Sequence, residues 1–244
     1  IRDASHLLLE LINEVLDMGK LESGEIMLEE VPFNLYDIAQ NVLEVIEKMA
    51  EERKIEITQD NIGVAHWNLI GSPVHVKRIM MNFISNAVKY NKEHGKIMLR
   101  CREISTEGDT AVFEFTCRDT GIGMSREFQE HLFEPFTQER VGGYSKYGST
   151  GLGMSITMAL VKRMGGDITF ESEKDKGTTF VITIPFKIDT EKREAEQKAK
   201  KSVCSIAGMN ILLVEDNELN MEIVEFITQN AGAVVTKAWN GREA

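Results

Sequence analysis

The sequence has few cysteines, no long apolar run and no excess of positive charge, and each of these absences excludes a class of protein. Its three cysteines (Cys101, Cys117 and Cys204) are widely spaced and form no C-x-x-C pair, so we expect reduced, buried thiols rather than a disulfide framework or a zinc site. No apolar run approaches the ~18 residues that span a bilayer, and no signal-peptide pattern opens the chain. These features predict a cytoplasmic location without membrane contact, although a longer parent protein could be anchored through regions upstream.

The charge balance disfavours two kinds of partner. Lys and Arg number 28 against 39 Asp and Glu, which gives a formal net charge of −11. Such a surface repels nucleic acid and anionic lipid, so neither is expected as a partner. A site for any anionic ligand must therefore gather its positive potential locally. The 244 residues, 42% hydrophobic and 27% charged, suffice for one good core and a second, smaller unit.

Residues 1–30 are expected to contain an amphipathic helix. Its apolar stripe has alternating spacings of four and three and consists of Ala4, Leu8, Leu11, Val15 and Met18. A lone helix this apolar needs a partner helix or a second copy of itself.

Residues 31–187 alternate between helix and strand patterns. Asn34 precedes a helix with the apolar face Leu35, Ile38, Ala39, Val42, Ile46 and Met49. Ser72 and Pro73 open a second helix, which runs to residue 91 and has the core face Val76, Ile79, Met80, Phe83, Ile84 and Ala87. Period-two alternation predicts strands around residues 111–118, 168–170 and 180–184. The mixture predicts an α+β sandwich with helices on one face of a mixed sheet.

Two further segments follow. Residues 188–208 are highly charged, have no hydrophobic face and are expected to form a linker. Residues 209–244 predict a strand at 210–214, an amphipathic helix and a second strand at 234–238. A parallel strand–helix–strand unit of this size cannot bury both of its faces, so we expect a cut or incomplete fold.

The second helix places three polar side chains on one side. Asn82, Asn86 and Lys89 stand at i, i+4 and i+7, opposite the core face. Two carboxamides and an ammonium suit a hydrated divalent cation on phosphates, because Asn oxygen can bind Mg²⁺ and Lys neutralises phosphate. A solvated polar face is the alternative.

Two glycine-rich motifs follow in the chain. Asp119 comes directly after a strand, and Gly121 and Gly123 then allow a tight turn and close approach by a flat ligand. The carboxylate could accept a hydrogen bond from an exocyclic amine, or it could only stabilise the turn. Residues 148–153 lead into a helix whose N-terminus can bind phosphate. They match neither a Walker A loop nor a Rossmann fingerprint.

Between these motifs lies a segment with the composition of a lid. Phe133 and Phe136 anchor its start, and glycines follow up to residue 147. An ordinary surface loop is the alternative. Residues 177–180 could close the pocket or form only a hairpin turn.

In this order the motifs resemble the sequence boxes of sensor histidine kinases. Residues 82–90 resemble the N box, 119–123 the G1 box, 133–136 the F box, 148–153 the G2 box and 177–180 the G3 turn. The resemblance covers about residues 31–186. The wider family is that of the Bergerat-fold ATPases, which also includes gyrase-type topoisomerases, mismatch-repair ATPases and heat-shock chaperones.

The resemblance implies a site for ATP with Mg²⁺. Asn86 would ligate the metal, while Asn82 and Lys89 would face the phosphates. Tyr90 would lie against the adenine, and Asp119 would accept a hydrogen bond from its amino group. The complete set expected around the nucleotide is Asn82, Asn86, Lys89, Tyr90, Asp119, Gly121, Gly123, Phe133, Phe136, Gly148, Thr150, Gly151, Leu152, Gly153 and Thr178.

The flanking segments resemble other parts of the same signalling proteins. Residues 7–24 resemble the second helix of the dimerisation hairpin, and residues 209–244 the start of a receiver domain. Glu215 and Asp216 would form the acidic Mg²⁺ pocket of that receiver. The combination implies a hybrid histidine kinase that forms a homodimer through its dimerisation helices, with a His-bearing hairpin and receiver domains as partners.

One departure bears on activity. The family's phosphoacceptor His lies in a His-Glu-x-x-x-Pro setting, which this sequence lacks. His6 lies on the second helix, where a packing or surface role is expected rather than phosphoacceptance. The receiver's phosphoacceptor Asp is expected beyond Ala244, so we expect nucleotide binding without autophosphorylation. Two alternatives remain, a nucleotide-holding scaffold and a Bergerat-fold ATPase clamp.

Overall fold

The computed structural model describes residues 12, 15–16, 19, 27–139, 150–192 and 207–244. The chain divides into two compact units, Ile1–Thr190 and Glu191–Ala244. Of the predicted opening helix, residues 12, 15, 16 and 19 are described; they are helical, and the apolar ones are exposed. The rest of its stripe lies outside the described residues. Among all the described residues of the chain, no helix is long and apolar enough to cross a membrane.

From residue 27 to residue 188, the described part of the first unit contains seven strands and four helices. In chain order they are β1 (Val31–Asn34), α2 (Leu35–Glu51), β2 (Glu56–Asp60), β3 (Asn68–Gly71), α3 (Pro73–Lys89), β4 (Lys96–Glu107), β5 (Thr110–Asp119), α4 (Arg126–His131), α5 (Gly153–Arg163), β6 (Asp167–Glu173) and β7 (Gly177–Ile188).

The strands form one mixed sheet in the order β1-β3-β7-β5-β4-β2. Only β2 and β4 pair in parallel within it. The long strand β7 pairs with β5 along one edge, from Lys187 to Thr179. Its other edge pairs with β6 near its start and with β3 at its end. The predicted mixed sheet is therefore confirmed, and β7 is the strand that joins its parts.

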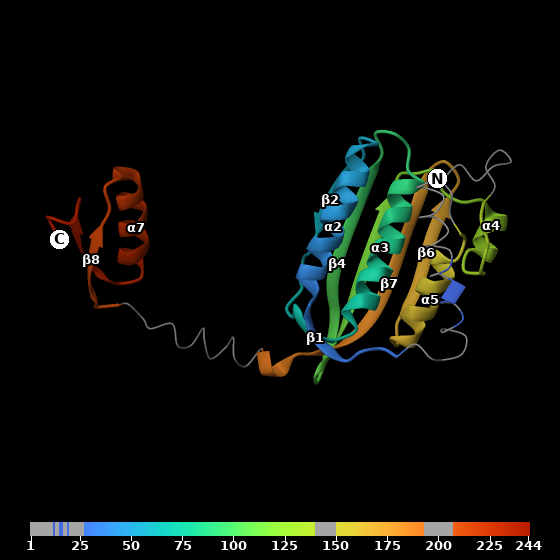
Figure 1. Cartoon of the computed structure of the whole chain (residues 1–244), viewed down its shortest axis with the longest axis horizontal. Helices are drawn as coiled ribbons and strands as arrows, with labels where there is room; N and C mark the ends of the chain where they lie inside the picture. Colours follow the sequence, from blue (N-terminus) through green and yellow to red (C-terminus); the bar gives the residue numbers. More distant parts are fainter. Residues whose placement is uncertain (1–11, 13–14, 17–18, 20–26, 140–149, 193–206) are drawn as a thin grey trace. The chain divides into compact units, whose positions relative to one another are not determined.

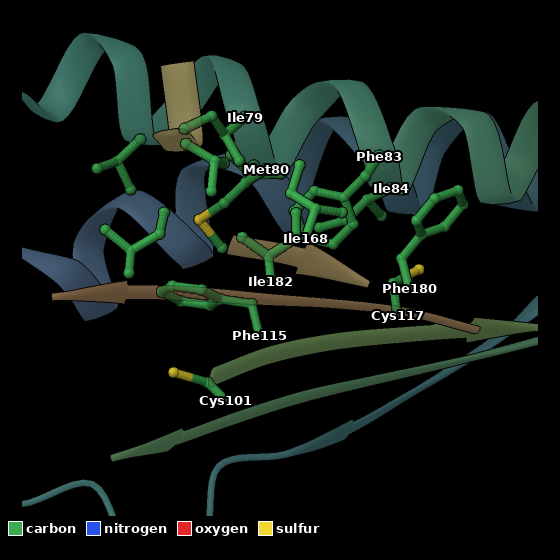
Figure 2. Packing of buried hydrophobic residues seen from close by; sticks show 14 of the residues in the cluster. Ile79, Met80, Phe83, Ile84, Cys101, Phe115, Cys117, Ile168, Phe180 and Ile182 are labelled. Atoms are coloured by element: carbon green, nitrogen blue, oxygen red, sulfur yellow. The ribbon is translucent and has the colours of Figure 1, made fainter. Parts of the chain in front are cut away.

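Helices α2, α3 and α5 cover one face of the sheet (Figure 1). The core lies between these helices and the strands, as Figure 2 shows for Phe83 of α3 above Phe115 and Ile182. All six predicted core residues of α3 are buried. The alternation predicted for β5 is also confirmed, because Ala111, Phe113, Phe115 and Cys117 are buried and the residues between them are not. Helices on one face of a mixed sheet are thus what the sequence predicted.

Two predicted helix starts are present, with a difference at the second. Asn34 caps α2, because its side-chain oxygen accepts a hydrogen bond from the Asp37 N–H (3.1 Å). Ser72 is the N-cap of α3, and Pro73 is the first helical residue. The Ser72 hydroxyl, however, pairs with His75 Nδ1 (2.7 Å) instead of a backbone N–H. The inclusion of Met49 in the core face of α2 was wrong. That residue is exposed, because it lies on the solvent side of the last turn.

The cysteines among the described residues are free thiols. Cys101 and Cys117 lie on the core side of β4 and β5 (Figure 2) and are buried. Burial raises the pKa of the Cys101 thiol to about 12 and raises that of Cys117 further. Both are therefore protonated, unreactive core residues, as predicted, while Cys204 lies outside the described residues.

The second unit contains β8 (Asn210–Val214), α7 (Glu218–Asn230) and β9 (Val234–Ala238), and the two strands pair in parallel. These elements occupy the residues where the sequence predicted them. Met221 and Ala238 are buried, whereas Phe226 and Leu219 are mostly exposed. The described part of this unit thus leaves much of its apolar surface in solvent.

Candidate functional site

Several predicted site residues meet at one end of the first unit. There β5 ends at Asp119, α3 ends at Lys89, and the turn between β6 and β7 lies beside the loop that follows β5. Main-chain hydrogen bonds join these parts: Ile122 N–H donates to the Tyr90 carbonyl (3.0 Å), and Asp175 N–H donates to the Ile122 carbonyl (2.7 Å). Helix, loop and hairpin therefore form one connected framework.

Asp119 is buried at the end of β5, with 9% of its surface exposed. Its Oδ1 accepts hydrogen bonds from two backbone N–H groups, those of Gly121 (2.8 Å) and Thr178 (3.2 Å). No hydrogen bond to Oδ2 occurs within the described ranges of the chain. Burial raises the pKa of the Asp119 carboxyl above its ordinary 3.8, and the two N–H donors offset this only in part. A donor that approaches Oδ2 thus meets an acceptor that is largely removed from water.

The glycines of the loop after β5 permit its close approach to the rest of the site. A Cβ on Gly121 would lie 2.4 Å from the Tyr90 carbonyl oxygen. Gly123 has φ +60°, and a Cβ there would lie 2.0 Å from the carbonyl oxygen of Glu173. A larger residue at either position would separate the loop from the end of α3 or from the hairpin.

Two asparagines of α3 contact the start of α5. The Asn82 carboxamide nitrogen donates to the Gly153 carbonyl and to Thr157 Oγ1, both at 2.5 Å. The Asn86 nitrogen donates to Met154 Sδ (3.5 Å). All three bonds use a carboxamide nitrogen, so the oxygen of each carboxamide is the atom that remains suited to a cation. The predicted roles of Asn82 and Asn86 stay predictions.

Lys89 and Tyr90 lie next to each other at the end of α3. The ammonium of Lys89 is 5.4 Å from the centre of the Tyr90 ring, within the range of a cation–π interaction. A positive charge and an aromatic ring are therefore presented together beside the Asp119 loop.

The F-box aromatics have different surroundings. Phe133 packs edge-on against Phe170 of β6, with ring centres 5.8 Å apart. Phe136 is 64% exposed and has a left-handed backbone, with φ +62°. Phe133 therefore anchors this segment in the core, whereas Phe136 presents its ring to solvent.

The described part of the G2 motif lies against the end of the F-box segment. A Cβ on Gly151, whose φ is +75°, would lie 2.7 Å from the main chain of Phe136. Thr150 Oγ1 accepts a hydrogen bond from Leu152 N–H (3.2 Å), and Leu152 is fully buried. Gly148 and residues 140–147 of the predicted lid lie outside the described residues.

Sequence reasoning missed Ser172 of β6. Its hydroxyl accepts a hydrogen bond from Met124 N–H (2.9 Å) and is 2.9 Å from Thr178 Oγ1. It thereby links the loop after Gly123 to the residue that donates to Asp119. A single serine in an ordinary strand carries no sequence signal for this role, because the contact arises only from strand pairing.

The acidic pair of the second unit lies after β8. Glu215 Oε1 accepts hydrogen bonds from Asn217 N–H (3.3 Å) and Asn220 Nδ2 (3.2 Å), and Asp216 is exposed. Within the described residues, no cluster of three or more His, Cys, Asp or Glu side chains is placed to hold a metal. His6 lies outside the described residues.

The residues at the end of α3 and β5 fit an adenine nucleotide with its metal. A desolvated carboxylate oxygen suits an exocyclic amine, and the glycine loop lets a flat ring approach the main chain. The Asn86 oxygen is a neutral ligand of the kind that Mg²⁺ accepts, and the Lys89 ammonium can neutralise phosphate.

Comparison with known proteins gives three further findings. A family model described as histidine kinase-, DNA gyrase B-, and HSP90-like ATPase matches residues 71–188. The autoinducer 2 sensor kinase/phosphatase LuxQ of Vibrio parahaemolyticus is 30% identical over 100% of this chain and 29% of its own length. The signal transduction histidine-protein kinase BarA of Escherichia coli K12 is 35% identical over 74% of this chain and 20% of its own length. This chain therefore spans less than a third of either relative.

Two solved structures share the fold. Full-length ShkA, crystallised in complex with AMPPNP, matches with a TM-score of 0.64 and 24% identity, over 99% of this chain and 47% of that chain. The catalytic domain of the histidine kinase ThkA matches with a TM-score of 0.54 over 64% of this chain and 95% of that chain, at 23% identity. The helices on one face of a mixed sheet are thus those of a Bergerat fold.

Proposed function

Because residues 71–188 of this chain belong to the family of histidine kinase-, DNA gyrase B- and HSP90-like ATPases, and its relatives are sensor histidine kinases, we propose that it is the catalytic ATP-binding core of a hybrid sensor histidine kinase. In the complete protein, this core transfers the γ-phosphate of ATP to a His on a dimerisation helix. The phosphoryl group then passes to an Asp of a receiver domain.

The arrangement around Asp119 carries the proposal. Two main-chain donors hold Oδ1 in place, so Oδ2 is the carboxylate atom left to accept the adenine amino group. GTP carries an oxo group at that position, and its acceptor would face an acceptor. We therefore propose that adenine is selected over guanine by Asp119, with Tyr90 against the ring and Gly121, Gly123 and Thr178 shaping its edge.

The phosphate end of the site is built from α3 and the start of α5. We propose that Asn86 ligates Mg²⁺ and that Lys89 neutralises phosphate charge. Bound Mg²⁺ would supply charge neutralisation and orientation of the phosphates. Gly151 and Gly153 would bring main-chain N–H groups of the α5 N-terminus to the phosphates, where the helix dipole favours negative charge. Asn82 fixes α5 against α3 and thereby sets the distance between these two elements.

Transfer to histidine is mainly a matter of positioning. The attacking imidazole nitrogen forms a bond to the γ-phosphorus as the bond to the ADP oxygen breaks, in line with the attack. The acceptor His would come from a separate dimerisation hairpin. We propose that the second unit is the start of a receiver domain, with Glu215 and Asp216 in its Mg²⁺ pocket, and that the complete protein is a homodimer acting in the cytoplasm.

Two measurements test this function. First, titration calorimetry should show binding of Mg²⁺-ATP and little binding of Mg²⁺-GTP. Second, incubation with γ-labelled ATP should leave this chain unlabelled and should label an added hairpin that contains His-Glu-x-x-x-Pro, with an acid-labile, base-stable product. ATP binding without hairpin labelling would favour a scaffold. Label on this chain that is lost in His6→Ala would make His6 the phosphoacceptor.

A further inference from the structure

A residue outside all the predicted motifs holds the end of α3. Arg53 lies in the turn between α2 and β2, and its guanidinium reaches the last turn of α3. Nη1 donates to the carbonyl oxygens of Val88 and Lys89, the latter at 2.6 Å, and Nη2 donates to that of Asn91 (2.8 Å). The last carbonyls of a helix lack partners within the helix, and a cation there also complements the helix dipole.

The main chain beneath Arg53 is fixed. Ile55 N–H donates to the Ala50 carbonyl (2.9 Å) and Lys54 N–H to the Glu51 carbonyl (3.0 Å), which is the Schellman pattern at a helix end. Ile55 and Ala50 are both buried in the core. The guanidinium thus extends from a turn that is held by two main-chain hydrogen bonds and by buried neighbours, which suits it to anchor the end of α3.

The turn that Arg53 holds is the one from which the nucleotide residues project. Lys89 is the last residue of α3 and Tyr90 is its C-cap, and Asn86 lies one turn earlier. The Tyr90 carbonyl also accepts the Ile122 N–H, which ties the loop after Asp119 to the same turn. A shift of this turn would therefore move the metal-binding and adenine-binding sides of the site together.

From these contacts we infer that Arg53 is a positioning residue for the nucleotide site, acting through the main chain of α3. The inference rests on the proposed function. The chemistry requires a guanidinium, because its planar fork of N–H donors reaches several carbonyls at once, whereas the compact ammonium of lysine lacks that fork.

The test compares Arg53→Met and Arg53→Lys with the wild type by calorimetric titration of Mg²⁺-ATP, at a temperature where circular dichroism shows each protein folded. Arg102→Met is the matched control, because Arg102 lies on β4 and pairs with Glu114 of the sheet. We expect Arg53→Met to raise Kd about tenfold, which is the scale of a lost charged hydrogen bond. The Kd of Arg53→Lys should lie between those of the wild type and Arg53→Met, and the Arg102→Met control should have the wild-type Kd.

Hydrogen exchange separates positioning from general stability. We compare the exchange rates of two amides in Arg53→Met with their rates in the wild type. The rate of the Ile122 amide should rise by a larger factor than that of the Ile182 amide of β7, because only Ile122 bonds to the turn that Arg53 holds. Acceleration of both by one common factor, or an unchanged Kd, would overturn the inference. Should Arg53→Met fail to fold, a wild-type Kd in Arg53→Lys would likewise overturn the inference. A wild type that does not bind Mg²⁺-ATP defeats the proposed function itself, whereas binding that Arg53→Met preserves defeats only this inference.

Discussion

The two oxygens of Asp119 have different surroundings, and this difference separates stability from binding. Oδ1 is held by the N–H groups of Gly121 and Thr178, and an asparagine oxygen could accept the same two bonds. Oδ2 is the atom that we assign to adenine. A change that replaces only Oδ2 should therefore disturb the ligand more than the fold.

We predict that Asp119→Asn raises the Kd for Mg²⁺-ATP at least about tenfold, because a donor would then face the adenine amine. Calorimetry measures this, and Asp109→Asn, in the exposed turn between β4 and β5, is the control that should bind normally. Wild-type affinity in Asp119→Asn would remove Asp119 from adenine recognition.

The same substitution should not lower the thermal stability of the ligand-free protein. Burial raises the pKa of the Asp119 carboxyl in the folded state, so the folded state binds its proton more tightly than the unfolded state does. Its contribution to the free energy of unfolding is therefore present below pH 3.8 and is lost as pH rises through the raised pKa. Above that range the neutral asparagine avoids the burial of a charge, so Asp119→Asn should melt at or above the wild-type Tm. The difference in Tm between Asp119→Asn and the wild type should shrink on acidification, as calorimetric scans at several pH values would show.

Asn86 offers a test of the metal. We predict that Asn86→Ala weakens the binding of Mg²⁺-ATP much more than the binding of ATP measured in EDTA. The alanine removes the proposed metal ligand, and besides it only the weak bond to Met154 Sδ. Asn41→Ala, at an exposed asparagine of α2 that bonds only to its own helix, is the control among the described residues. Equal losses with and without Mg²⁺ would place Asn86 outside the metal site.

At the scale of elements, the end of α2 contains a strained residue. Lys54 occupies the left-handed position of the Schellman motif, with φ +55°, where glycine is usual. We predict that Lys54→Gly raises the free energy of unfolding by about 0.5–1 kcal/mol, because relief of the left-handed strain exceeds the added freedom of the unfolded chain.

Urea denaturation measures this effect, and Lys48→Gly is its control. Lys48 lies inside α2, where glycine should instead cost about 1 kcal/mol. A loss of stability in Lys54→Gly similar to that in Lys48→Gly would show that the backbone at Lys54 is not strained.

The elements also show how far the sequence could predict the structure. The core face of α3 and the alternation of β5 follow from periodicity, which reports burial directly. Strands β1, β2, β3 and β4 were not predicted. The first three are short, and the polar, exposed second half of β4 interrupts the apolar alternation that would have marked it. Asp119 and the polar residues of α3 could be singled out as candidates, because each motif is defined by the spacing of residues that are close together in the chain. Arg53 and Ser172 could not be found, because their contacts arise only when separate elements meet.

At the scale of the molecule, all the proposed nucleotide residues belong to the first unit, Ile1–Thr190. We predict that a chain ending after Thr190 binds Mg²⁺-ATP with unchanged Kd and retains the thermal transition of the first unit. Calorimetric titration and differential scanning calorimetry of both chains measure this. A loss of affinity would show that residues 191–244 contribute to the site.

The pairing of β7 has a consequence for how this protein is made. β7 is the last strand of the first unit in chain order, yet it pairs with β3, β5 and β6. During synthesis, the edge of β5 that β7 will cover therefore stays without its partner until residue 188 has left the ribosome. An uncovered strand edge invites pairing with other chains. The nascent chain should thus be most prone to aggregation, and most dependent on chaperones, just before translation passes β7.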